Sequence, residues 1–202
     1  MMSEFERWET RFAAPGYVFG TEPNAFLKSQ ARLLKPGWKA LSVADGEGRN
    51  SVWLAEQGLD VQAFDFSPRA VAKARTLAKQ RGVTLKTEVA DIYSWNWPTA
   101  EFDVIAVIFI QFIGPDALDG VFAGIKKALK PGGLLLMEGY QVRQLKYGTG
   151  GPSNVANLWT RDMLERTFAD FSSIQITEED RELAEGNRHV GMAAVIDFVG
   201  WK

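Results

Sequence analysis

The sequence of 202 residues contains no cysteine and one histidine, His189. Without cysteine, disulfide bonds, thiolate metal sites and cysteine nucleophiles are excluded. A single histidine also excludes a metal site built from several imidazoles, which leaves carboxylates as the only ligand cluster available. We therefore expect no metal centre and few side chains that serve as a general base.

Long apolar runs and a strong charge imbalance are also missing. The longest apolar run, residues 104–110, is too short to cross a bilayer, and residues 1–12 are charged and aromatic, unlike a signal peptide. The formal net charge of −2 argues against a large phosphate-binding surface. These absences predict a cytoplasmic protein that binds neither nucleic acid nor a membrane.

Apolar runs alternate with helical patterns between residues 39 and 140, which is typical of a parallel sheet covered by helices. Ser67 before Pro68 predicts the start of a helix, and Gly82 predicts its end. Strands are expected at residues 39–44, 60–65, 84–89, 102–109 and 134–138, with helices after the first, second and fourth of them and a turn at residues 131–133.

The other segments follow less regular patterns. Residues 141–157 are polar and rich in glycine, which predicts a long loop of the kind that often carries function. Helices are expected at residues 21–34 and 158–168. Two antiparallel strands are expected at residues 171–178 and 190–199, joined through a charged segment at 179–188, and the whole chain is expected to form one domain.

The most informative pattern is a strand, a glycine turn and the start of a helix at residues 40–50. Gly46 and Gly48 let the backbone approach a ligand closely, and the N–H groups of the helix that follows suit an anionic group. Asp65 ends the next expected strand, where a carboxylate can accept both hydroxyls of a ribose. This combination predicts a nucleotide-shaped site, although aspartate is also common as a turn cap.

Two ligands fit this pattern, a dinucleotide and S-adenosylmethionine. Ser51 supplies the third small residue of a dinucleotide fingerprint, so spacing alone does not exclude NAD(P). A hydride-transfer enzyme usually needs a second half-sheet or a substrate domain, for which this chain is short. Asp91 and Ile92, after the third expected strand, suit the amino group and the ring of adenine, which favours an adenosine pocket.

Several motifs carry a family resemblance: residues 46–50, 61–68, 90–91, 102–105 and 129–133, with Trp8, Arg11, residues 19–20 and 23–24 near the N-terminus and the loop 144–152. In these motifs the chain resembles class I S-adenosylmethionine-dependent methyltransferases, and most of all small bacterial enzymes similar to tellurite-resistance and thiol methyltransferases. The resemblance covers nearly the whole chain. It implies an α/β fold, a Rossmann-like three-layer sandwich whose seven-stranded, mostly parallel sheet has an antiparallel last strand.

The resemblance also implies S-adenosylmethionine as the cofactor of one methyltransferase domain spanning 1–202, with residues 1–36 as an N-terminal lid and 141–157 as a substrate-side loop. Two positions depart from the family pattern. Ser42 stands where the family has an acid and Ala44 where it has its first glycine, so we expect a weaker hold on the methionine amino group and less room beside the ligand. The implied cofactor-binding residues are Ala44, Gly46, Gly48 and Asn50 around the methionine moiety, Asp65 at the ribose, and Phe66, Asp91 and Ile92 at the adenine.

The expected activity is methyl transfer to a small-molecule acceptor. A soft nucleophile, such as a thiol, selenium or tellurium species, is favoured because the sulfonium methyl is already activated and such an acceptor needs little help from a base. His189 is expected to be structural. Acceptor contacts are assigned to Trp8, Gln111, Tyr140 and Tyr147, and Trp8, Tyr17 and Phe19 are candidates for an aromatic lid over the cofactor.

Three points stay open at this stage. Ser42 and Ala44 leave room for a non-catalytic protein that binds S-adenosylmethionine or S-adenosylhomocysteine. An NAD(P)-dependent reductase is a second alternative. The chain is expected to be a monomer or a homodimer.

Overall fold

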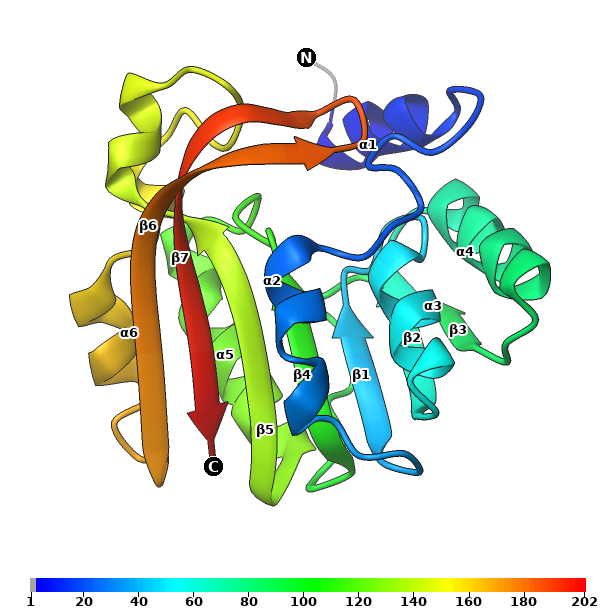
Figure 1. Ribbon diagram of the computed structural model, residues 1–202. Coiled ribbons are helices and arrows are strands. Elements are labelled where there is room, and N and C mark those ends of the chain that lie inside the picture. Colours follow the sequence, from blue (N-terminus) through cyan, green and yellow to red (C-terminus); the bar gives the residue numbers. More distant parts are fainter. Residues whose placement is uncertain (1–2) are drawn as a thin grey trace. The chain divides into compact units, whose positions relative to one another are not determined.

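Seven strands form the sheet of the computed structural model, which describes residues 3–202. Hydrogen bonds order them β3-β2-β1-β4-β5-β7-β6. The predicted seven-stranded, mostly parallel α/β architecture is confirmed, and so is an antiparallel strand near the end of the chain (Figure 1). Among residues 3–202, no helix combines the length and the apolar character that crossing a membrane requires.

Two compact units divide the described residues, and each is described by itself. The first comprises residues 3–95 and 185–188. Its elements are α1 (Glu4–Phe12), α2 (Ala25–Ser29), the 3₁₀ helix η1 (Ala31–Leu33), β1 (Lys39–Val43), α3 (Arg49–Glu56), β2 (Asp60–Asp65), α4 (Pro68–Arg81) and β3 (Lys86–Val89).

Three parallel strands form the centre of the first unit. β1 pairs with β2 from Lys39 opposite Asp60 onwards, and β2 pairs with β3 so that Asp65 lies opposite Val89. As predicted, the Ser67 side chain caps α4 and Gly82 ends it in the left-handed conformation. The matched registers bring the carboxyl ends of the three strands to one edge of the sheet, where ligands bind in open α/β folds.

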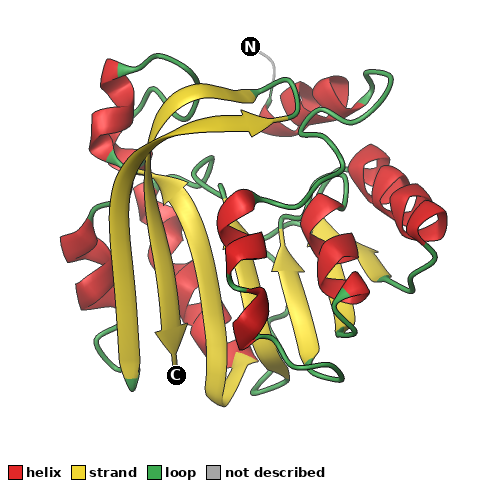
Figure 2. Ribbon diagram, in the orientation of Figure 1, coloured by secondary structure: helices red, strands yellow, loops and turns green. Residues whose placement is uncertain are grey.

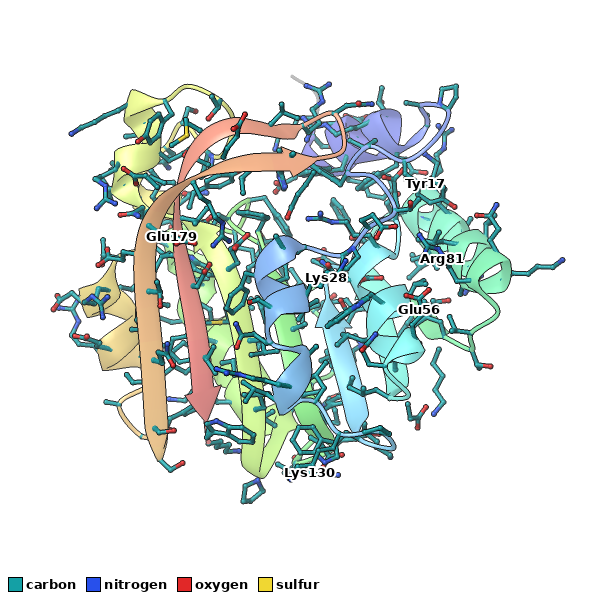
Figure 3. All side chains as sticks on the ribbon, in the orientation of Figure 1. Tyr17, Lys28, Glu56, Arg81, Lys130 and Glu179 are labelled. Carbon is teal, nitrogen blue, oxygen red and sulfur yellow. The ribbon has the colours of Figure 1, made fainter. Side chains whose placement is uncertain are left out.

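The ends of α3 and α4 are joined by an ion pair. Arg81 lies 3.6 Å from Glu56 and 2.9 Å from Glu22, and Figure 3 shows Arg81 and Glu56 facing one another. Tyr17 packs nearby on the buried side chains of Val52 and Leu77. The segment before β1 is therefore fastened to the helices of this unit.

The second unit comprises residues 96–184 and 189–202. β4 runs parallel to β5, which pairs antiparallel with β7. A cluster of buried aromatic rings, with Phe122 facing Trp159 and Phe168, forms part of its core. Its elements are β4 (Phe102–Ile108), α5 (Pro115–Ala128), β5 (Leu129–Tyr140), the 3₁₀ helices η2 (Val142–Lys146) and η3 (Val155–Asn157), α6 (Arg161–Thr167), β6 (Ser173–Glu185) and β7 (His189–Trp201).

Four sequence predictions of local structure need correction (Figure 2). The helix expected at 21–34 is two short helices, because the Asn24 side chain starts α2 only at Ala25 and Gln30 separates it from η1. The helix expected at 158–168 begins at Arg161, because the side chain of Thr160 caps it. The turn expected at 131–133 lies inside β5, at the irregular start of its pairing with β4.

The fourth correction concerns the charged segment 179–188, most of which is strand. β6 runs on to Glu185, so the turn before β7 contains only residues 186–188. The charged side chains of residues 179–185 are tolerated in a strand because β6 lies at the edge of the sheet, where most of them stay exposed or half-buried. The single-domain organisation, with its lid and loop, stays a prediction.

Candidate functional site

The turn between β1 and α3 has an unusual backbone. Ala44, Gly46 and Gly48 all take positive φ angles, of 48°, 62° and 94°. At Gly48 a Cβ atom would lie 2.7 Å from both the Cα and the Cβ of Ala74 in α4. Glycine is therefore required at position 48 by both conformation and space.

Asp65 lies at the end of β2 and holds this turn. Its carboxylate accepts hydrogen bonds of 2.9 Å from the N–H groups of Gly46 and Ser67. Burial raises the pKa of Asp65 to about 6, against the opposing effect of those two hydrogen bonds. A carboxylate has about four acceptor sites, so two remain for ligand hydroxyls. The same residue thus fixes the glycine turn and keeps the capacity that the ribose prediction requires.

Ser42 and Asp45 satisfy one another instead of facing a ligand. The Ser42 hydroxyl donates to Asp45 over 2.6 Å, and Asp45 also accepts from the N–H and hydroxyl of Ser51. Burial raises the pKa of Asp45, while the bonds from Ser42 and Ser51 lower it. Asp45 is thus a support for the first turn of α3 and does not replace the acid that the family carries at position 42.

Ala44 takes a conformation that favours glycine. A non-glycine residue in the left-handed region destabilises the folded state by roughly 1–2 kcal/mol. Replacing it by glycine removes this strain, but part of the gain is offset because glycine makes the unfolded chain more flexible. We expect Ala44→Gly to raise the free energy of unfolding by about 1 kcal/mol, measured by urea denaturation. An unchanged or lower stability would show that the Ala44 side chain contributes packing that outweighs the strain.

The adenine-side residues surround the ends of β2 and β3. The N–H of Ala90 donates to the carbonyl of Asp65 over 3.0 Å, so the two strand ends lie side by side. Asp91 is exposed and accepts from the N–H of Tyr93, while Ile92 is buried. Phe66 is half-buried, edge-on to Phe5 at 5.7 Å. Asp91 forms the turn that its residue type suggests, and its side chain is exposed.

Asn50 belongs to a buried polar network. Its side-chain oxygen accepts from the Asn24 N–H over 2.9 Å. Glu185 accepts from the Asn24 side chain and the Ala25 N–H, each over 3.0 Å, and forms a 2.8 Å ion pair with Arg49. The sequence does not predict this network, because Asn24 and Glu185 are 161 residues apart and neither residue type indicates its partner.

Glu47, inside the glycine turn, anchors the N-terminal segment. It is buried, accepts from the Val18 N–H over 2.6 Å and pairs with Lys73 at 2.7 Å. Lys73 also donates to the carbonyl groups of Ala14 and Gly16. The segment before α2 is therefore tied to the turn that the sequence assigns to the cofactor.

The predicted aromatic lid divides into two groups. Trp8 stacks on Phe12 at 5.5 Å and lies 6.2 Å from Phe19, whereas Tyr17 packs on α3 and α4. Phe12 is the α1 residue nearest the turn, since a Cβ atom at Gly46 would meet its ring at 3.7 Å. Trp8 and Phe19 thus stay candidates for the lid, while Tyr17 is part of the helical packing.

In the second unit, two of the predicted acceptor contacts already form hydrogen bonds within the protein. The buried Gln111 amide donates to the Tyr140 carbonyl over 2.7 Å and accepts from the Tyr140 N–H. Tyr147 donates to Asp180 over 2.9 Å, and this bond is the largest cause of its raised pKa. Gln111 and Tyr140 are brought together, whereas the Tyr147 hydroxyl bonds to β6.

Two aromatic neighbours of Tyr140 were not predicted as site residues. Phe109 follows β4 with a φ of 55° and stacks on Tyr140 at 4.7 Å. The His189 ring lies edge-on to Phe109 at 4.4 Å and 6.0 Å from Tyr140. A strained bulky residue at a strand end is typical of functional sites. The sequence signal was an aromatic residue directly after a buried strand.

The fold is that of S-adenosylmethionine-dependent methyltransferases of known structure. The structure of TehB from Haemophilus influenzae superposes with a TM-score of 0.70 at 17% identity, covering 89% of this chain and 62% of that one. A protein studied for the conversion of a disulfide bond into a thioacetal group during echinomycin biosynthesis gives a TM-score of 0.76 at 18% identity, over 98% of this chain and 91% of that one.

Residues 40–133 match the family model described as a methyltransferase domain. This stretch, which holds the glycine turn, Asp65 and Asp91, is similar to that domain, and the predicted resemblance to class I methyltransferases is confirmed. An uncharacterized methyltransferase of Synechocystis is 29% identical over 121 residues, which are 59% of this chain and 55% of that protein. The chain thus matches about half of that relative's length.

Proposed function

We propose that this protein transfers a methyl group from S-adenosylmethionine to a small-molecule acceptor with a soft nucleophilic atom. The observation that carries the proposal is the Asp65 carboxylate, fixed by the Gly46 and Ser67 N–H groups at the end of β2. This carboxylate bonds to a turn of positive φ angles and would accept the ribose hydroxyls there, which supports the proposal. The match of residues 40–133 to the methyltransferase domain model supports this cofactor over a nicotinamide dinucleotide.

The residues of the first unit would hold the cofactor. Asp65 would accept the ribose hydroxyls, Phe66, Asp91 and Ile92 would surround the adenine, and the turn from Ala44 to Asn50 would support the methionine moiety. When bound, S-adenosylmethionine supplies an activated methyl group. The protein then contributes positioning, which can lower the barrier by roughly 7–11 kcal/mol for a well-aligned pair.

The scarcity of bases supports a soft nucleophile. The chain has no cysteine and only one histidine, and its ring packs on Phe109 and near Tyr140. A thiol has a pKa near 8.5 and reaches its reactive thiolate form without a strong base. The small number of bases in the chain therefore supports a soft nucleophile as the methyl acceptor.

Asp65→Ala tests the cofactor site. We expect it to weaken S-adenosylhomocysteine binding by about 1–3 kcal/mol, the cost of leaving buried hydroxyls unpaired. Isothermal titration calorimetry measures the change, and Asp60→Ala, an exposed acid at the start of β2, is the matched control. Equal affinities of wild type and Asp65→Ala would show that Asp65 only caps the turn.

The pH dependence gives an independent test. With a pKa of about 6, Asp65 loses its charge as the pH falls through 6, and a protonated carboxyl is a poorer acceptor for ribose hydroxyls. We expect S-adenosylhomocysteine affinity to fall below pH 6 by up to about tenfold per unit. The free energy of unfolding of the unliganded protein depends on pH in the opposite direction. Because the pKa of Asp65 is raised by folding, its contribution to stability is complete below the ordinary pKa of an aspartate and is lost as the pH rises through 6. Asp65→Asn removes both effects, and a wild-type affinity that stays flat between pH 5 and 7 contradicts the assignment.

A second candidate function is non-catalytic cofactor binding. Its support is that Ser42 bonds to Asp45 and offers no carboxylate to the methionine amino group, while Ala44 takes a strained conformation. Incubation with methyl-labelled S-adenosylmethionine and a panel of thiols separates the two functions. Label in a methylated thiol supports the enzyme, whereas saturable binding without transfer supports the binding protein.

A further inference from the structure

Carboxylates near the N-terminus are almost all engaged by a partner. Glu4 pairs with Arg7 at 3.3 Å, and Glu6 belongs to the capping box with Ser3. Glu9 pairs with Arg69, and Glu22 with Arg81. At the end of β6, Glu185 pairs with Arg49. Among the described carboxylates of this region, Glu4, Glu9, Glu22 and Glu185 are thus each paired with an arginine, while Glu6 bonds to Ser3.

Two arginines of the same region have no such pairing. Among the ion pairs of residues 3–202, neither Arg11 of α1 nor Arg188 of the β6–β7 turn is joined to a carboxylate. Arg11 lies over the Trp8 ring at 4.3 Å from its centroid. Burial lowers the pKa of Arg11, and the positive charges of Arg188 and Arg7 lower it further. Two like charges are therefore held near one another in a protein whose net charge is −2.

Backbone contacts hold the turn that carries Arg188 against residues 18–19. The Asn187 N–H, next to Arg188, donates to the Val18 carbonyl over 2.9 Å. A Cβ atom at Gly186 would meet the Phe19 backbone at 2.3–2.4 Å, so the turn sits directly on this segment. Phe19 in turn lies 6.2 Å from Trp8, the ring under Arg11. Figure 1 shows the β6–β7 turn beside α1.

We propose that Arg11 and Arg188 form a subsite for an anionic oxygen group, a carboxylate or phosphate, of the methyl acceptor. Uncompensated arginines present planar forks of N–H donors that match carboxylate and phosphate. The inference rests on the proposed function and makes it narrower: the acceptor carries a negative charge as well as a soft nucleophile. The subsite borders Trp8, the N-terminal residue that the sequence assigns to the acceptor.

The other source of an anionic group is the carboxylate of the cofactor itself. Phe12, not Arg11, is the α1 side chain that lies nearest the glycine turn. Arg11 instead lies over the Trp8 ring, and the charge of Arg188 acts on it. The geometry therefore favours the acceptor, and the experiment measures both sources.

The test compares two matched thiols, 3-mercaptopropionate and 3-mercapto-1-propanol, as acceptors for labelled S-adenosylmethionine. Wild type is expected to prefer the carboxylate in kcat/KM, and Arg11→Met and Arg188→Met are each expected to reduce that preference about tenfold. Arg188→Lys should recover part of it, because charge remains while the fork is lost. Arg7→Met is the control, since Arg7 is exposed on the same helix and already paired with Glu4.

Calorimetry separates failure of the subsite from failure of methyl transfer. With S-adenosylhomocysteine bound, 3-(methylthio)propionate should bind more tightly than 3-(methylthio)-1-propanol, and this difference should shrink in both arginine variants. Equal binding of the two compounds by wild type overturns the subsite, even if thiols are methylated. A loss of S-adenosylhomocysteine affinity in Arg11→Met and Arg188→Met, with the acceptor preference intact, overturns it in favour of the cofactor carboxylate. Anion-selective binding without any methyl transfer supports the subsite and contradicts the proposed enzyme activity.

Discussion

Glu185→Ala is expected to lower the free energy of unfolding by about 3–5 kcal/mol, because removing one member of a buried ion pair leaves the other charge uncompensated. The side chains of Arg49 and Glu185 are each only 8% exposed, and their atoms approach to 2.8 Å. The substitution also removes the acceptor for the Asn24 side chain and the Ala25 N–H. Urea denaturation followed by tryptophan fluorescence measures the loss.

Two further variants show whether the loss comes from the charge. Glu182→Ala, an exposed glutamate on the same strand, should change stability by no more than about 0.5 kcal/mol. The double variant Arg49→Met, Glu185→Leu should recover the part of the loss that comes from the uncompensated charge, while the Asn24 side chain and the Ala25 N–H still lack their acceptor. If Glu185→Ala lowers the free energy of unfolding as little as Glu182→Ala does, the Arg49–Glu185 pair contributes little to stability. The network would then not hold α2 in place.

The Glu185 network also shows where sequence reasoning ends. Ser67, Pro68 and Gly82 predicted α4 because helix caps act on their immediate neighbours. The bond between Asn24 and Glu185 joins residues 161 positions apart, and neither residue type indicates its partner. Local chemistry could therefore be predicted, whereas pairings that depend on the completed fold could not.

The charged segment before β7 illustrates the same limit. Charge at 179–188 suggested a connection, but an edge strand tolerates polar side chains, and β6 continues to Glu185. Arg181 is one reason why the strand continues through the charged segment, since it bonds to Glu138, Glu179 and Asp197. Glu138 and Asp197 lie opposite one another on β5 and β7. A strand that carries one arginine over two buried acids is not recognisable from hydropathy alone.

The cofactor side was more predictable than the acceptor side for a physical reason. Glycine turns and strand-end acids form short continuous motifs, so Gly46, Gly48 and Asp65 could be placed before the fold was known. Acceptor contacts come from separate loops. Gln111 was expected to face a ligand, yet its amide is bonded to the Tyr140 backbone, and Phe109 and His189 were found only through their ring contacts.

Gly48→Ala tests the position on which the turn depends most. A Cβ atom there would lie 2.7 Å from the Cα of Ala74, which is backbone and cannot rotate away. Overpacking costs typically 1–3 kcal/mol and the left-handed conformation roughly 1–2 kcal/mol, so we expect the free energy of unfolding to fall by about 2–5 kcal/mol in urea denaturation.

Gly46→Ala is the matched control for Gly48→Ala. Its φ is also positive, at 62°, but its Cβ atom would meet only the Phe12 ring, at an ordinary 3.7 Å. It should therefore show the conformational cost alone, about 1–2 kcal/mol. Adding Ala74→Gly to Gly48→Ala should recover only part of the loss, because it removes the Cβ of Ala74 and leaves its Cα in place. Equal destabilisation by Gly46→Ala and Gly48→Ala would mean that α4 moves aside to admit the Cβ atom and that position 48 does not require glycine for reasons of space.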